Sequence, residues 1–251
     1  MSRRCSVMVL VFLAAHVGLA PAGGLIFRLP EDGSWATYEG VLSRRADAGG
    51  LAPKVDSTLK TTVYIASVGE VTIDKQRCRW LEIRFDLSVP VGDPTLKEKP
   101  TYRLLQRQTF KILIPEQYLV PDESPLDHFV RAWVRFDDSE AWVVTRRKEL
   151  DETALAALLD ERWRETDFKH IEKTDVESKL GKVACEGLEA TAVAPDDPSK
   201  KGRVRVRVHP RSPFGVVTAD WAFDGPGGAV TWSLKLVDFG QNATTKIPEG
   251  R

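Results

Sequence analysis

Residues 79 to 89 read Arg-Trp-Leu-Glu-Ile-Arg-Phe-Asp-Leu-Ser-Val, and this stretch decides the fold class. The odd positions from Leu81 to Val89 are all apolar, whereas the even positions from Glu82 to Asp86 are all charged. A repeat of two residues is the pattern of a β-strand with one buried face. The stretch therefore predicts a long strand that separates a core from solvent.

The same alternation recurs along most of the chain. Valine alternates with arginine over residues 202–208, and apolar residues share one face over residues 230–236. Further strands are predicted at residues 34–44, 58–68, 102–114, 171–179, 183–193 and 216–223. Long alternating strands with short links are typical of antiparallel sheets. The predicted fold class is therefore mainly antiparallel β (α+β), as a strongly curved β-meander or half-barrel.

Two amphipathic stretches near mid-chain predict helices. In the first, Ser124 is a suitable N-cap and Pro125 occupies the first helical position. The apolar stripe that follows is Leu126, Phe129, Val130, Trp133 and Val134. The second helix is expected from about Asp151 to Glu165, with the stripe Leu155, Leu158, Leu159 and Trp163. We therefore expect a helical insert at about residues 115–165, packed on the sheet of a single domain that spans residues 23–251.

The first 22 residues have the pattern of a cleavable secretory signal peptide. Arg3 and Arg4 precede an apolar run, and Ala20-Pro21-Ala22 forms an A-x-A exit. The apolar run is shorter than the roughly 20 residues of a membrane span. An uncleaved anchor and the twin-arginine export route are the lesser alternatives. We expect cleavage after Ala22, export to the periplasm or medium, and no integral membrane segment in the mature chain.

The charge balance argues against nucleic acid as a dedicated partner. The 251 residues hold 36 Lys and Arg and 36 Asp and Glu. Loss of Arg3 and Arg4 leaves a formal charge of about −2, without the basic excess of a nucleic-acid-binding surface. The remaining 229 residues (251 less 22) are enough for one well-cored domain.

Two cysteines, Cys78 and Cys185, remain after cleavage. An even pair in an oxidising compartment favours a disulfide between them. The alternative is two unpaired buried thiols, because cysteine often packs as a small hydrophobe.

The sequence contains no recognisable catalytic or metal-binding motif. It has no G-x-S-x-G elbow, and His128, His170 and His209 have no matching acid and nucleophile pattern. No C-x-x-C or H-E-x-x-H spacing occurs. We therefore expect no cofactor and no metal, although carboxylates that the fold brings together are a kind of active site that no local motif excludes.

Two groups of side chains are candidates for ligand contact. Arg203, Arg205 and Arg207 share one face of a predicted strand and could meet an anion, although a solvated strand face explains them as well. Seven tryptophans either fill a core or line a groove for apolar ligands. Trp80 is the exception, because alternation places it on the face of Glu82 and Arg84.

Several blocks of the chain resemble uncharacterised exported bacterial proteins that are rich in β-structure. These blocks are Asp32–Tyr38, Cys78–Ile83, Lys111–Pro115, Asp127–Trp133, Ser178–Lys182, Ser212–Val217 and Leu236–Gly240. The long antiparallel strands and mid-chain helices are also similar to the incomplete barrel of LolA- and LolB-type lipoprotein carriers. That resemblance implies a curved sheet that shelters an acyl chain. It carries over no binding residue, because this chain places its helices later.

Three functional hypotheses follow. The first is an exported, non-enzymatic protein that binds an apolar ligand, such as a lipid acyl chain or a lipoprotein, in its curved sheet. The second is a structural or interaction protein of the cell envelope, with another envelope protein as partner and no pocket. The third is a hydrolase whose carboxylates are assembled by the fold.

Overall fold

The computed structural model describes residues 25–45, 56–91, 101–119, 125–150, 153, 155, 159, 164–165, 169–194, 197–225 and 228–247. Within these ranges the chain forms a twelve-stranded antiparallel sheet. Its strands are β1 (Trp35–Arg45), β2 (Asp56–Ile73), β3 (Gln76–Val91), β4 (Thr101–Pro115), β5 (Arg131–Phe136), β6 (Trp142–Val144), β7 (Arg164–Glu165), β8 (Lys169–Ser178), β9 (Gly181–Ala194), β10 (Asp197–Val208), β11 (Val216–Gly225) and β12 (Gly228–Gly240).

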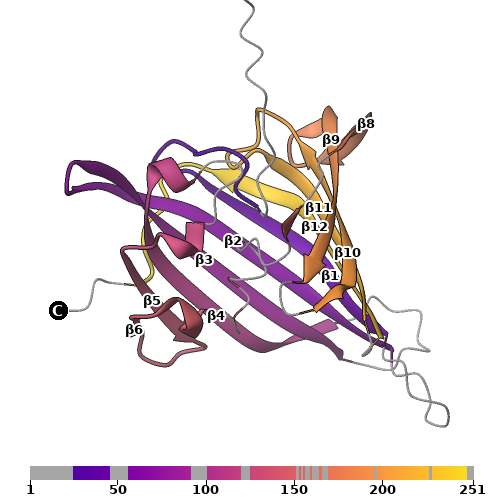
Figure 1. Cartoon of the computed structure of the whole chain (residues 1–251), viewed down its shortest axis with the longest axis horizontal. Helices are drawn as coiled ribbons and strands as arrows, with labels where there is room; N and C mark the ends of the chain where they lie inside the picture. Colours follow the sequence, from indigo (N-terminus) through magenta and orange to yellow (C-terminus); the bar gives the residue numbers. More distant parts are fainter. Residues whose placement is uncertain are drawn as a thin grey trace, which may run out of the picture.

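The strands follow the order β6-β5-β4-β3-β2-β1-β12-β11-β10-β9-β7 (Figure 1). The first and last long strands, β1 and β12, pair in the middle of the sheet, from Trp35 opposite Gly240 to Arg45 opposite Ala229. At the far edge, β7 and β8 both pair with β9 at successive positions, whereas β10 pairs with the other edge of β9. Each half of the chain is therefore an antiparallel meander, and one long-range pairing joins the halves.

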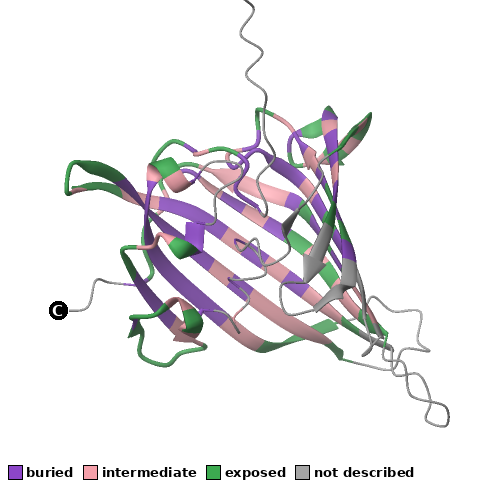
Figure 2. Ribbon diagram, viewed as in Figure 1, coloured by how far each residue is buried: buried purple, intermediate pink, exposed green. Residues whose placement is uncertain are grey.

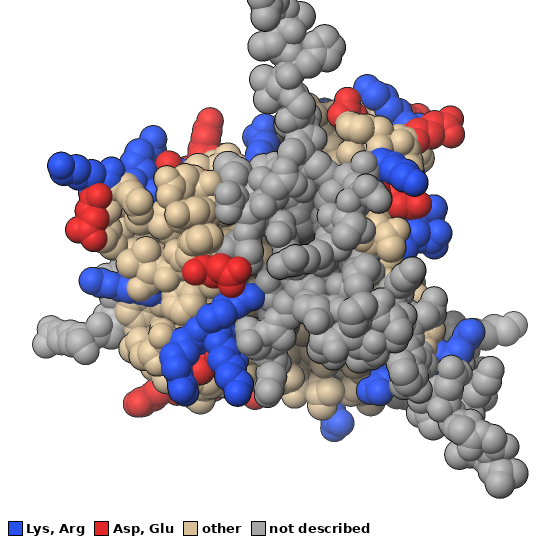
Figure 3. Space-filling view, viewed as in Figure 1, with Lys and Arg blue, Asp and Glu red and all other residues tan. Residues whose placement is uncertain are grey.

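The alternation predicted from sequence is confirmed for nine strands, from β1 to β4 and from β8 to β12. On the face that we call the core face, Tyr38, Val63, Ile83 and Phe110 are at most 1 % exposed. These residues belong to the main apolar cluster, which extends along the sheet from Val144 of β6 to Leu188 of β9 (Figure 2). Among the described residues visible in the same view, Figure 3 shows charged side chains mostly along the outline of the molecule.

The opposite face, which we call the outer face, has a smaller apolar cluster. Cys78, Trp80, Leu113, Trp133 and Ile247 form it, and all five are at most 8 % exposed. Trp80 and Trp133 lie with ring centroids 5.4 Å apart. The chain after β12 covers this cluster, because Ile247 is fully buried within it.

The first predicted helix, from Ser124, is wrong. Residues Pro125–Asp127 form a short 3-10 helix, η2, and the chain then enters β5. Val134 of β5 belongs to the core-face cluster, whereas Trp133 belongs to the outer cluster. Burial on both faces hides the period of two, so a turn followed by a strand produced the spacing of a helical stripe.

Most of the second predicted helix lies outside the described residues. Leu155 and Leu159, which belong to its predicted stripe, are helical and at most 1 % exposed. The other 3-10 helices described are η1 (Glu116–Tyr118) and η3 (Arg147–Glu149). The insert at residues 115–165 is therefore built from short turns and strands in its described part, and it has no described helix of seven or more residues.

The prediction of a strongly curved half-barrel is also wrong, because the sheet is open and not strongly curled. The predicted signal peptide, residues 1–22, lies outside the described residues. None of the helices in the described ranges has the length and apolarity needed to cross a membrane.

Candidate functional site

The strongest candidate site is a cavity of about 360 Å³ beside the segment that precedes β1. Phe27, Ala184, Val208 and Pro210 contribute its apolar lining, and Gly215 completes it. We call it the N-terminal cavity. Its volume falls within the range of small-molecule sites, which are mostly apolar with a few polar groups.

The N-terminal segment reaches this cavity through backbone pairing with the turn before β11. Phe27 N–H donates to the Phe214 carbonyl at 2.8 Å, and Ile26 forms a β-bridge with Gly215. Gly215 has a φ of +88°, and a Cβ there would lie 2.9 Å from the Cβ of Phe27. A glycine at position 215 is therefore what allows Phe27 to pack against the turn.

Four charged or titratable side chains also line the N-terminal cavity: Arg28, Lys173, Glu186 and His209. Lys173 Nζ lies 3.1 Å from a carboxylate oxygen of Glu186. Arg28 Nε donates to the Pro213 carbonyl at 3.3 Å. His209 Nδ1 accepts a hydrogen bond from Arg211 N–H. The polar part of the lining therefore carries an excess of cationic groups beside an apolar interior.

Part of the core face, by contrast, is covered by packed side chains. Leu119, Leu126 and Leu150, from the segment after β4, are at most 1 % exposed and pack into the main cluster. In the same segment, the rings of Tyr118 and His128 stack at 3.6 Å. The segment after β4 therefore covers part of the core face, in the region where Figure 1 shows η1 and η2 in front of the sheet.

The tryptophans divide between the two faces. Trp221 and Trp232 stack at 4.9 Å within the main cluster, where Phe85 meets Trp232 edge-on. Trp232 Nε1 donates to Thr61 Oγ1 at 3.0 Å, so its polar atom is satisfied. Trp80 lies on the face of Glu82, as predicted, but it is only 7 % exposed and Lys111 Nζ lies 5.0 Å from its ring centroid. Trp80 is therefore a packing residue of the outer cluster.

The three predicted arginines lie on the outer face of β10. Arg203 and Arg205 line a second hollow, of about 290 Å³, together with Asp220. Arg205 Nε contacts a carboxylate oxygen of Glu189. Arg207 instead donates to the Glu172 carbonyl at 2.6 Å. Arg203 and Arg205 therefore line one hollow, whereas Arg207 binds the backbone of β8.

The predicted disulfide between Cys78 and Cys185 is absent, because both thiols are free and buried. Cys78 belongs to the outer cluster and Cys185 to the main cluster, and the five strands β2, β1, β12, β11 and β10 separate β3 from β9 in the sheet. Burial raises the pKa of each thiol. Both sulfurs are therefore packed as small hydrophobes and are poor nucleophiles.

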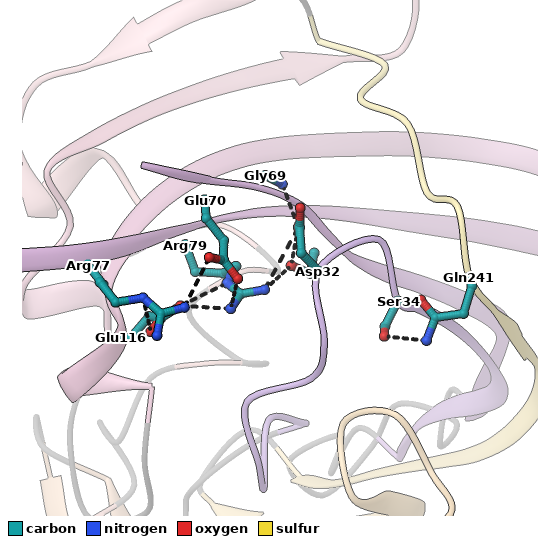
Figure 4. Close-up of polar contacts among 9 residues, drawn as sticks. Asp32, Ser34, Gly69, Glu70, Arg77, Arg79, Glu116 and Gln241 are labelled. Atoms are coloured by element: carbon teal, nitrogen blue, oxygen red, sulfur yellow. Dashed lines mark hydrogen bonds and ion pairs between the residues drawn. The ribbon is translucent and has the colours of Figure 1, made fainter. Parts of the chain in front are cut away.

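Sequence reasoning missed an ionic network around the buried Arg79, whose side chain is 4 % exposed, whereas those of Asp32 and Glu70 are 43 % and 40 % exposed (Figure 4). Arg79 Nη2 lies 2.6 Å from Glu70 and 2.7 Å from Glu116, and Arg79 Nη1 lies 3.8 Å from Asp32. Ser67 Oγ accepts a further hydrogen bond from Arg79. These are carboxylates assembled by the fold, but each faces the guanidinium, so the arrangement is that of a structural ion cluster.

No group of His, Cys, Asp or Glu that could hold a metal occurs among the described residues. The N-terminal cavity could not be found from sequence, because its lining comes from residues 27, 173, 184 and 208, which have no local pattern in common. The glycine and prolines of residues 210–215 were the only local signal, and they indicated no more than a turn.

No family model matches this sequence, and no curated protein matches it. Several solved structures align with most of the chain at 10 % identity and low TM-scores. A DUF1329 family protein from Desulfovibrio piger has a TM-score of 0.32, with 86 % of this chain and 88 % of that chain covered. A "putative lipoprotein" from Parabacteroides distasonis has a TM-score of 0.33, covering 87 % and 99 %. A β-barrel-like protein of the domain of unknown function DUF1849 from Brucella abortus has a TM-score of 0.34, covering 83 % and 99 %.

Proposed function

We propose that this protein is an exported, non-enzymatic binding protein for an amphiphile, with the apolar chain of the ligand held in the N-terminal cavity. The observation that carries the proposal is the cavity itself, about 360 Å³ in volume, with Phe27, Val208 and Pro210 in its lining. Burial of apolar ligand surface contributes roughly 25 cal/mol per Å² to binding. The ligand is a lipid acyl chain, free or attached to a lipoprotein.

The charged side chains of the lining favour an anionic head group. Two cationic side chains, Arg28 and Lys173, line the cavity together with one carboxylate, that of Glu186. Lys173 is already paired with Glu186, which leaves Arg28 as the cationic group available to a carboxylate or phosphate. A medium-chain fatty acid, such as dodecanoate, is therefore a suitable probe.

The carrier resemblance implied that the curvature of the sheet makes the ligand site. The sheet is open and not strongly curled, so the proposal now depends on the N-terminal cavity. With cleavage after Ala22, Phe27 is the fifth residue of the mature chain. A shortened or extended N-terminus is therefore expected to change ligand affinity.

Native mass spectrometry with dodecanoate tests the proposal, because it reports a bound fatty acid directly. Ala184 is exposed, so Ala184→Phe fills the cavity without disturbing the packed core. Thr72→Phe adds the same ring at an exposed position in the β2–β3 hairpin and is the matched control. We expect one dodecanoate on the unchanged protein and on Thr72→Phe, and at least tenfold weaker binding to Ala184→Phe. Equal binding to both variants would show that the cavity is not the site.

The head group is tested with dodecanol, which lacks the charge. Arg28→Gln is expected to weaken dodecanoate binding several-fold and to leave dodecanol binding unchanged. An equal loss of both ligands would contradict a role for Arg28 in recognising the anion.

The second candidate function is a structural or interaction protein of the cell envelope. The observation that favours it is the complete burial of Leu126 and Leu150 against the core face, which is the packing of an ordinary filled core. If neither the purified exported protein nor the dodecanoate mixture shows an adduct, this second function is the better account.

A further inference from the structure

The hollow that Arg203 and Arg205 line lies on the outer face, over β10, β11, β12 and β1. Its volume is about 290 Å³, and its polar lining is Arg203, Arg205, Asp220, Ser43, Thr231 and Ser233. We call it the outer hollow. It shares no lining residue with the N-terminal cavity.

The register of the strands explains why these side chains converge. Arg205 lies opposite Asp220, and Asp220 lies opposite Ser233. Two residues further along β12, on the same face, Thr231 lies opposite Ser43 of β1. Residues directly opposite one another in an antiparallel pair have Cβ atoms about 5 Å apart, so two neighbouring rows of polar groups meet in one place.

The charged groups of the outer hollow are not all neutralised. Arg205 contacts Glu189, which neutralises its charge. Arg203 is exposed and makes no side-chain hydrogen bond or ion pair with another described residue. Asp220 likewise has no hydrogen bond or ion pair within the described part of the chain. A guanidinium, which only donates, and a carboxylate, which only accepts, are therefore both available to a solute.

We propose that the outer hollow binds a small solute in which an anionic group lies next to hydroxyl or ammonium donors. The anionic group pairs with Arg203, as carboxylates and phosphates do with guanidinium groups. The donors bind Asp220, and the hydroxyls of Ser43, Thr231 and Ser233 take the remaining polar atoms. Both a sugar acid and a phosphoethanolamine group have this chemistry.

The raised pKa of Asp220, caused first by burial, is consistent with a carboxylate in a partly desolvated hollow. The neighbouring charges of Arg205 and Arg207 act in the opposite direction and favour the carboxylate. A donor from a solute has the same effect. Bound solute is therefore expected to favour the ionised form of Asp220.

Isothermal titration calorimetry with the full exported protein tests the proposal. The two probes are glucuronate and phosphoethanolamine, and the controls are glucose, which lacks the anion, and inorganic phosphate, which lacks the neighbouring donor. We expect one probe to bind at least tenfold more tightly than either control. Binding of glucuronate alone identifies a sugar acid, and binding of phosphoethanolamine alone identifies a lipid or glycan head group.

Three variants locate the binding. Arg203→Gln and Asp220→Asn are each expected to lower the affinity for the probe that binds by at least tenfold. Arg211→Gln removes an exposed arginine outside the hollow and is expected to have no effect. The proposal is wrong if neither probe binds with a dissociation constant below about 10 mM. It is also wrong if Arg203→Gln and Arg211→Gln weaken probe binding equally. Ala184→Phe should leave this binding unchanged, so the two sites succeed or fail separately.

Discussion

A carboxylate oxygen of Glu82, in β3, accepts a hydrogen bond at 2.7 Å from the backbone N–H of Lys246, 164 residues further along the chain. The same oxygen accepts from Thr245 Oγ1 at 2.8 Å and from Ile247 N–H at 3.3 Å. Glu82 is 1 % exposed. These three bonds tie the segment after β12 across the outer face, where Ile247 closes the cluster of Trp80 and Trp133.

Replacing Glu82 should release this segment. Hydrogen bonds to a charged group contribute about 1.5–3 kcal/mol each, and the three share one acceptor. We expect Glu82→Ala to lower the free energy of unfolding by about 3 kcal/mol in urea denaturation. Glu177→Gln changes an exposed glutamate on β8 and is the control, with a change within about 0.5 kcal/mol. Equal effects of the two substitutions would contradict this role of Glu82.

Arg79→Met should be strongly destabilising, because it leaves Asp32, Glu70 and Glu116 close together without their shared cation. Removing one partner of a buried ion pair costs about 3–5 kcal/mol. Arg77 also pairs with Glu70 and Glu116, but its side chain is 66 % exposed. Arg77→Met is therefore expected to have a much smaller effect, measured in the same denaturation experiment. A loss below about 1 kcal/mol for Arg79→Met would show that the network does not stabilise the fold.

Gly40 lies opposite Leu234 in the pairing of β1 with β12. A Cβ at position 40 would lie 1.6 Å from the Ser233 carbonyl oxygen, so Gly40→Ala must move backbone. We expect a loss of about 3 kcal/mol or more, since overpacking costs 1–3 kcal/mol even where side chains alone can shift. Gly181→Ala meets no atom within 4 Å but has a φ of +81°, so strain alone should cost about 1 kcal/mol. The reverse order of thermal midpoints for these two variants would contradict the close packing of β1 against β12 at Gly40.

The two buried thiols should react only when the protein unfolds. Burial raises the pKa of both Cys78 and Cys185, so the reactive thiolate is scarce in the folded state at pH 8. Peptide mass spectrometry after iodoacetamide treatment is expected to find neither residue modified in the native protein and both modified in urea without a reductant. Modification that requires a reductant would instead establish the disulfide that the sequence suggested.

Asp220 should make stability depend on pH. Its pKa is raised in the folded protein, so the unfolded chain releases this proton first and folding becomes less favourable as pH rises through the unfolded and then the folded pKa. Asp220→Asn has no proton to lose. Its thermal midpoint should therefore exceed that of the unchanged protein at pH 7, and this advantage should shrink as pH falls toward about 3.9, the ordinary value for aspartate. Asp74→Asn, in the β2–β3 turn, is the control, and a pH-independent difference for Asp220→Asn would contradict the prediction.

Local sequence was enough to predict nine strands, because a period of two is set by the geometry of each strand and needs no distant partner. The same rule failed at β5, where Trp133 and Val134 are buried on opposite faces. It also misplaced Glu82, which the alternation assigns to solvent. Glu82 is on the predicted face, but the segment after β12 covers that face.

By itself, therefore, the sequence determined the antiparallel class, most strand positions and the side of the sheet that each residue faces. The tertiary structure alone decided which of those faces is covered and what meets there. The N-terminal cavity joins Phe27 to Val208, the network of Arg79 joins Asp32 to Glu116, and the disulfide candidates lie in separate clusters. These contacts depend on the long-range pairing of β1 with β12 and on the packing of the chain ends against the sheet. The local sequence pattern around a residue does not identify partners that are distant in sequence and become neighbours only when the chain folds.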